Sequence, residues 1–310
     1  MPSASGQALN YATEYSRALA QAFPYVLNFG ALYATPNNNR YRWVNAKTIE
    51  IPSISTTGRV NANRDTVAFA QRNYDNAWET KTLTNERKWS TLVHPMDIDQ
   101  TNMVTTIANI TQVFNEEQKF PEMDAYTVSK IFQDWETLGK TADTTELTTS
   151  NILGVFDQLM LNMDNARVPA NGRILYVTHE VKKMLNNADK IERQINVESG
   201  PNAIDRRVNR LDEVQVIGVP ATLMKTLYKF TTGWEISPAA DQINMFLVHP
   251  LAVITPVSYT FSRLDAPSAL SEGKYTYYEE SFEDVFILNK KADAIQFNIT
   301  AGGGSGSGKN

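Results

Sequence analysis

The side chains best suited to catalysis or metal binding are three histidines and one pair of aspartates. The histidines are His94, His179 and His249; they lie far apart, and none belongs to an i, i+4 histidine pair or to a Ser/His/Asp pattern. Asp97 and Asp99 are two residues apart, a spacing that can hold a divalent cation. Because they lead into a helical stretch, positions at a helix start explain them better. We therefore predict no catalytic, cofactor-binding or metal-binding residue.

Two segments approach the phosphate-binding loop pattern G-x-x-x-x-G-K-[ST]. DWETLGKT has Asp134 in place of the first glycine, and it ends a predicted helix where the motif should begin one. GGSGSGKN has both glycines and Lys309, but it ends in Asn310 with no helix to follow. The dinucleotide pattern G-x-G-x-x-G does not occur. The sequence therefore predicts no nucleotide cofactor.

Composition limits the protein classes further. The chain has 310 residues, of which 42% are apolar and 20% charged, so it can fold into about two globular domains. It contains no cysteine, which excludes disulfides and thiolate sites and fits a reducing compartment. The net charge of -5 argues against a nucleic-acid-binding protein. The N-terminus lacks a signal-peptide pattern and no apolar run reaches 18 residues, so no membrane partner is expected.

Several helices can be predicted from the spacing of apolar residues. The clearest begins near Pro121 and ends before Gly139, with Val128, Ile131 and Trp135 on one stripe. Further helices are predicted for residues 7–23, near 107–114, near 152–163 and near 181–185.

Strands are predicted on both sides of these helices. TIEIPSI forms a strand interrupted at Pro52, and residues 54–92 form one long hairpin whose second half, Trp78–Trp89, is a single half-exposed strand. RILYVT, EVQVIGVP and INMFLVHP are buried-strand candidates in a helix-and-strand region, 141–255. Residues 256–299 return to β character. The prediction is an α+β fold with an inserted α/β domain.

The order of these parts resembles the major capsid proteins of tailed bacteriophages, which have the Hong Kong 97-type fold. The similarity is greatest to capsid proteins of phages that infect Gram-positive bacteria. The segments that carry it are TTGRVNANR, ERKWSTLVHPMDIDQTN, GRILYVTHEV, INMFLVHPLAV and YYEESFEDVFILNKKADAI.

The resemblance implies a name for each part of the chain. The expected parts are an N-arm, 1–40; a peripheral domain with a long spine helix, 41–53, 93–142 and 256–300; an extended loop or hairpin, 54–92; an axial domain, 143–255; and a flexible tail, 301–310.

The implied function is structural rather than enzymatic. Copies would assemble as hexamers and pentamers into an icosahedral or prolate shell that encloses a double-stranded DNA genome without reading its sequence. Separate scaffold, portal and decoration proteins are further candidate partners, and the expected location is the virion, assembled in the host cytoplasm. Contacts between subunits are expected at hairpin residues Arg59, Arg64, Phe69, Arg72, Tyr74, Trp78 and Lys81.

Two other functions stay open at the level of sequence. One is the shell of a cellular nanocompartment with the same fold, and the other is a soluble hydrolase that uses Asp97, Asp99 or a histidine. Some members of the capsid family cross-link their subunits through a lysine near the hairpin tip. Here the tip region carries arginines, which stay protonated and cannot attack a carbonyl, so we expect a noncovalent shell.

Overall fold

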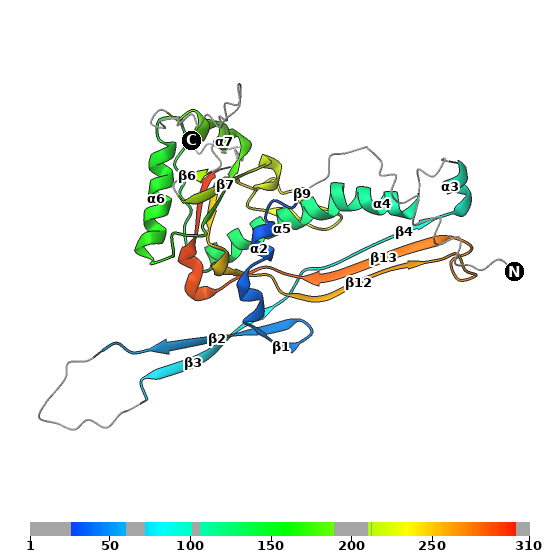
Figure 1. The fold of residues 1–310 in the computed structure, drawn as a ribbon, viewed down its shortest axis with the longest axis horizontal. Helices are drawn as coiled ribbons and strands as arrows, with labels where there is room; N and C mark the ends of the chain where they lie inside the picture. The colour runs from blue at the N-terminus through cyan, green and yellow to red at the C-terminus, as the bar shows by residue number, and fades with distance from the viewer. Residues whose placement is uncertain (1–25, 60–71, 101–105, 189–209, 212, 302–310) are drawn as a thin grey trace, which may run out of the picture.

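The computed structural model describes residues 26–59, 72–100, 106–188, 210–211 and 213–301. Figure 1 shows an α/β body, a long arm in which a helix lies over a sheet, and a narrow ribbon that projects beyond them. Within the described ranges, every helix is too short or too polar to cross a lipid bilayer. The helix predicted for residues 7–23, the predicted tail after residue 301, and the predicted contact residues Arg64 and Phe69 lie outside the described residues.

The body is built on one five-stranded sheet with the order β15-β10-β5-β7-β6. Its strands are β5 (Ile174–Thr178), β6 (Arg210–Leu211), β7 (Val214–Val219), β10 (Gln242–Val248) and β15 (Ile295–Thr300), and only β5 and β7 pair in parallel. Helices α6 (Ile152–Asn165) and α7 (His179–Asn186) cover one face, where Val177 and Met245 are buried with them. The opposite face packs against the long helix of the arm.

The long helix is assembled from three consecutive segments. These are α4 (Ile107–Phe114), the π-helical turn η2 (Asn115–Lys119) and α5 (Phe120–Thr137). Pro121 lies in the first turn of α5, as predicted, but the chain before it is already helical. A proline removes one helical hydrogen bond and clashes with the preceding turn, and the wider π-turn next to it accommodates both effects. The predicted stripe is confirmed, since Val128, Ile131 and Trp135 are all buried.

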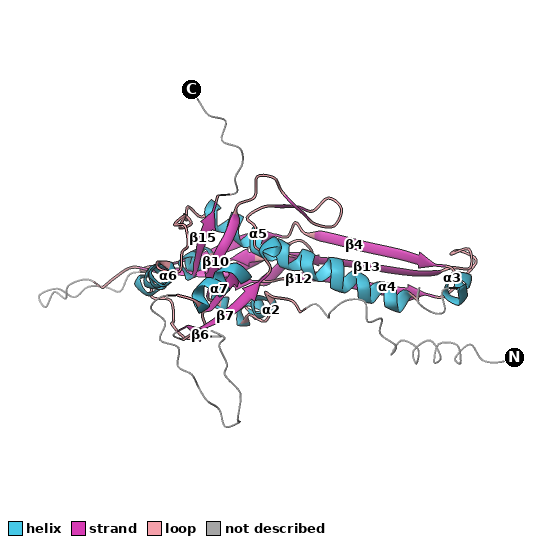
Figure 2. Ribbon diagram, turned by 90° about the horizontal axis from the view of Figure 1, so that it is seen from above, coloured by secondary structure: helices cyan, strands magenta, loops and turns pink. Residues whose placement is uncertain are grey.

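The arm also contains a three-stranded antiparallel sheet with the order β12-β13-β4. Its strands are β4 (Glu86–Val93), β12 (Val257–Asp265) and β13 (Tyr275–Glu283). Figure 2 shows the helix running along this sheet for much of its length. The ring of Trp89 stacks on Phe114 at a centroid distance of 3.9 Å, which joins β4 to α4. Alternate side chains of the sheet therefore point either toward the helix or away from it.

The ribbon consists of β1 (Arg42–Asn45), β2 (Thr48–Thr56) and β3 (Tyr74–Thr82), paired in that order. The prediction that Pro52 interrupts the first strand is wrong, because β2 runs through it and Pro52 pairs with Trp78. Pairing with β1 ends at Glu50, so at Pro52 the strand has one free side, where a proline is tolerated.

The prediction of one continuous strand over Trp78–Trp89 is also wrong. The chain leaves the ribbon after Thr82 and enters the sheet of the arm at Glu86, so the predicted hairpin of 54–92 divides between two sheets. The buried carboxylate of Asp284 holds the crossing point. It accepts hydrogen bonds from the backbone N–H of Thr84 at 2.8 Å and from its hydroxyl at 3.2 Å.

The last strand, β15, lies within the predicted peripheral range of 256–300 and forms an edge of the sheet in the body. The remaining short elements connect the three parts: α2 (Gly30–Tyr33), η1 (Pro36–Asn39), α3 (Pro95–Gln100), η3 (Ala221–Leu223), β8 (Tyr228–Lys229), β9 (Glu235–Ile236), η4 (Pro250–Ala252), β11 (Val253–Ile254), β14 (Phe286–Ile287) and η5 (Asn289–Ala294).

Candidate assembly surfaces

The histidines occupy separate elements and have structural surroundings. His249 follows β10, and its Nδ1 accepts a hydrogen bond from the N–H of Leu251 at 3.1 Å, which caps η4. Burial lowers the pKa of His249, so its neutral form is favoured. His179 begins α7 and lies so close to Gly218 that a Cβ there would come within 2.9 Å of its ring. Among the described residues, no three His, Asp or Glu side chains gather as a metal site would require.

The aspartate pair falls within the short helix α3. Asp97 lies in the first turn of this helix, where a carboxylate is favoured by the partial positive charge of the helix N-terminus. This agrees with the helix-start interpretation for Asp97. For Asp99 the interpretation is wrong, because Asp99 is the fifth of the six residues of α3 and lies in its last turn.

One face of the ribbon, here called the ribbon face, carries apolar side chains that nothing in the described chain covers fully. It consists of Pro52, Ile54, Tyr74 and Trp78. Residues directly opposite in an antiparallel pair share a face, and Pro52 pairs with Trp78 while Thr56 pairs with Tyr74. Trp78 is 44% exposed, although the Arg42 guanidinium lies 3.7 Å over its ring. The ribbon face is therefore a candidate interaction surface.

The other face of the ribbon is tied to the chain's own body. Ile49 and Ile51 are buried there in a small core with Leu83 and Phe286. On β3, directly opposite Ile49, Lys81 has its Nζ 3.0 Å from a carboxylate oxygen of Glu79 and donates to the side-chain oxygen of Asn289 at 2.9 Å. These contacts fix the direction in which the ribbon leaves the body.

The predicted contact residues therefore lie in different surroundings. Tyr74 and Trp78 belong to the exposed ribbon face, and Arg59 and Arg72 are exposed near the far end of the ribbon. The Arg72 guanidinium lies 4.9 Å from the centre of the Tyr74 ring and donates to the Tyr74 carbonyl at 3.1 Å. Lys81 is engaged within its own subunit, so its part in a contact between subunits stays a prediction.

A second exposed apolar surface lies on the arm, on the side of the sheet that faces away from the helix. We call it the sheet face, and it consists of Tyr259, Phe261 and Tyr278. The Tyr259 and Phe261 rings stack at 6.3 Å, and Phe261 lies 6.1 Å from Tyr278. Phe261 is 39% exposed. Sequence reasoning did not identify this surface, because the alternation in SYTF shows only that Tyr259 and Phe261 share one face of a strand and not that this face is exposed.

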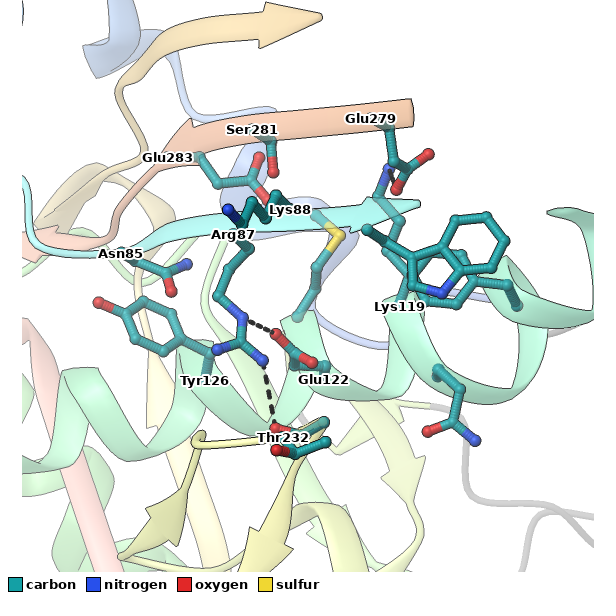
Figure 3. A pocket seen from close by; sticks show the side chains of 15 residues that line it. Asn85, Arg87, Lys88, Lys119, Glu122, Tyr126, Thr232, Glu279, Ser281 and Glu283 are labelled. Atoms are coloured by element: carbon teal, nitrogen blue, oxygen red, sulfur yellow. Dashed lines mark hydrogen bonds and ion pairs between the residues drawn. The ribbon is translucent and has the colours of Figure 1, made fainter. Parts of the chain in front are cut away.

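The helix side of the same sheet encloses a polar pocket of about 320 Å³, shown in Figure 3. Arg87 crosses it to reach Glu122 at 2.6 Å and the carbonyl of Phe230 at 2.6 Å, while Lys119 pairs with Glu279 at 3.0 Å. Burial raises the pKa of Glu283 at the pocket wall, and Glu122 and Glu279 raise it further against the lowering effect of Lys119. The paired charges join helix to sheet.

Comparison with protein-family models gives no match for the sequence, and comparison with curated proteins gives none either.

The arrangement of body, arm and ribbon is the fold of phage capsid proteins, as comparison with solved structures shows. The mature capsid of bacteriophage PhiM1 aligns with a TM-score of 0.63 at 12% identity, over 91% of this chain and 89% of that one. The capsid of cyanophage P-SCSP1u aligns with 0.61 at 10% identity, over 92% and 91%. The head of Helicobacter pylori bacteriophage KHP40 aligns with 0.60 at 9% identity, over 91% and 93%. The predicted α+β capsid fold is confirmed.

Proposed function

We propose that this chain is the major capsid protein of a tailed bacteriophage. Many copies assemble as hexamers and pentamers into an icosahedral or prolate shell around double-stranded DNA. The observation that supports this most strongly is the capsid fold itself, which covers more than nine-tenths of the chain in the alignments to the PhiM1, P-SCSP1u and KHP40 structures. The parts expected from the sequence keep their proposed roles as N-arm, extended loop, peripheral domain and axial domain.

The ribbon is the proposed connector between copies. Beyond Glu50 the ribbon consists of β2 and β3 only, and a two-stranded ribbon is marginally stable at best on its own. Its ribbon face stays exposed in the single subunit. We infer that this face lies on the sheet face of a neighbouring copy. The lengths agree, since β3 and β12 each have nine residues and therefore span about 30 Å.

The sheet face carries charges of both signs, so charge does not decide the contact. Glu280 lies beside Phe261, but Lys88 is opposite Glu280 and Arg263 is opposite Tyr278 on the same face. A patch that meets a different patch on the next copy makes a heterologous contact, and such contacts repeat around rings and shells. Of the contact residues proposed from the sequence, Tyr74 and Trp78 belong to this connection, and Arg64, Phe69 and Lys81 stay proposed contacts between copies.

Scaffold, portal and decoration proteins are proposed as separate partners, and the virion is the proposed location after assembly in the host cytoplasm. No observation favours a nanocompartment shell over a phage capsid. Among the described residues, no group of three possible metal ligands favours a metal-dependent hydrolase.

The test is to express the full chain and examine it by size-exclusion chromatography and negative-stain electron microscopy. We expect closed particles far larger than a small oligomer. A chain that remains a monomer or small oligomer at every protein and salt concentration would contradict the proposal.

A further inference from the structure

A small pocket lies where the ribbon joins the body, and we call it the root pocket. Its volume is about 220 Å³. It is lined by Asn37, Arg40, Tyr41, Ile51, Pro52, Ile254, Leu288 and Lys291. Because Ile51 and Pro52 belong to β2, whatever fills this pocket touches the ribbon and the body together.

Two cationic side chains line the root pocket, and no carboxylate does. Lys291 Nζ donates to the carbonyl of Leu251 at 3.0 Å, and the described part of the chain offers it no ion-pair partner. The same holds for the guanidinium of Arg40. Burial lowers the pKa of Lys291, and the nearby charge of Arg40 lowers it further. An anion placed between the two would relieve this repulsion.

A third polar side chain that lines the pocket, Asn37, has one buried atom without a hydrogen-bond partner among the described residues. Asn37 is 1% exposed, and its Nδ2 donates to the carbonyls of Leu251 at 2.7 Å and Val253 at 3.2 Å. These two bonds fix the orientation of the amide. Its Oδ1 accepts no hydrogen bond from any described residue. A buried acceptor without a donor is unfavourable, so the occupant of the pocket should also supply an N–H or O–H.

The remaining walls are apolar. Ile254 is buried, Ile51 nearly so, and Tyr41 and Leu288 pack against the same small core. These walls suit the methylene stem of a side chain that ends in a charge. A glutamate or aspartate within a peptide fits all three features, because its carboxylate accepts from both cations and its backbone N–H can reach the amide oxygen.

We propose that the root pocket binds an acidic side chain of a neighbouring copy of this chain. This inference rests on the proposed shell function, which brings copies into contact. Charge supports a second copy as the source, since the chain carries 34 acidic against 29 basic residues and none of the described acids lines this pocket. An acidic side chain bound there would contact the ribbon and the body together. It would therefore fix the angle between them at the value that the contact between copies requires.

The experiment is zero-length carbodiimide coupling in particles assembled from an equal mixture of ¹⁴N- and ¹⁵N-labelled full-length chains. The reagent joins an amine to a carboxylate in direct contact. We expect peptides that contain Lys291 joined to an acidic peptide, with both isotopes in one product. Lys119 and Glu279, 3.0 Å apart in one subunit, serve as the control that couples within single copies.

Two matched variants test how much the root pocket contributes to the free energy of assembly. Lys291→Gln should abolish the mixed-isotope product and raise the protein concentration needed for assembly by about fivefold. Lys140→Gln is the control, because Lys140 pairs with Asp293 and does not line the pocket.

The outcomes separate the two proposals. Particles in which Lys119 couples but Lys291 does not, or in which Lys291 couples only within single copies, would overturn the root-pocket inference and leave the shell function standing. Failure to form particles at all would overturn both.

Discussion

Replacing Trp135 by alanine should remove the side chain that joins the long helix to the sheet of the body. Trp135 is 1% exposed. Its indole Nε1 donates to the carbonyl of Ala292 at 3.1 Å, and its ring meets Phe297 edge-on at a centroid distance of 5.1 Å. The variant therefore loses packing against β15 and a hydrogen bond to η5 in one step.

The loss of stability can be estimated from these contacts. Truncating a buried tryptophan to alanine costs about 3–5 kcal/mol. Leaving the carbonyl of Ala292 without its donor adds about 1 kcal/mol. The total of about 4–6 kcal/mol is a large share of the roughly 5–15 kcal/mol that stabilises a typical domain. At about 2–4 °C per kcal/mol, the melting temperature should fall by about 8–24 °C, or the protein should become insoluble.

The assay is thermal unfolding of unassembled subunits, with two companion variants. Trp135→Phe keeps most of the buried area but removes the donor to Ala292, so we expect a loss of about 1–2 kcal/mol and a soluble protein. Glu136→Ala changes the next, exposed residue and should stay within about 0.5 kcal/mol of the parent. Equal melting temperatures for the parent and Trp135→Ala would refute the reasoning, as would an equal loss in Glu136→Ala.

Three further predictions follow from the ribbon and from the polar pocket of the arm. Replacing residues 57–73 by Asn-Gly, which joins Thr56 to Tyr74, should leave the circular dichroism of the subunit near the parent's but prevent shell formation; an unfolded product would show that this segment supports a core. Glu283→Gln should raise the melting temperature above neutral pH. The raised pKa of Glu283 means that the folded state binds the proton more tightly, so the stability contributed by this group is present at low pH and is lost as pH rises through the folded pKa. The gain in melting temperature should therefore shrink as pH falls toward 4.5, the ordinary pKa of glutamate. A gain in melting temperature that grows on acidification would contradict the raised pKa of Glu283. Finally, particles boiled in detergent and reductant should run as a single band near 34.8 kDa, because Lys81 is held by Glu79 and Asn289 in its own subunit; a ladder of multiples would show covalent cross-links.

The sequence predicted those elements whose pattern arises within the element itself. The stripe of α5 and the apolar runs of β5, β7 and β10 reflect local periodicity, and all of them are present. The break between β3 and β4 could not be predicted in this way. Its cause is Asp284, which lies 200 residues beyond Thr84 in the sequence and binds it only in the folded chain.

The exposure of the ribbon face could be predicted from the sequence, whereas the exposure of the sheet face could not. Tyr74 and Trp78 stand out in a polar strand, so their exposure could be expected from the sequence. The sheet face could not, because Tyr259 and Phe261 look like core residues of an ordinary strand. They are exposed because the long helix covers only the other side of this sheet, and no local pattern shows which side a distant helix will cover.

The central claim is that the exposed ribbon face of one copy is buried against the sheet face of the next copy in a closed shell. Cryo-electron microscopy of assembled particles tests this most directly. The account predicts a closed shell in which Trp78 of each ribbon is buried against Phe261 and Tyr278 of a neighbouring copy. A closed shell in which the ribbon face remains in solvent, or folds back on its own subunit, would contradict it.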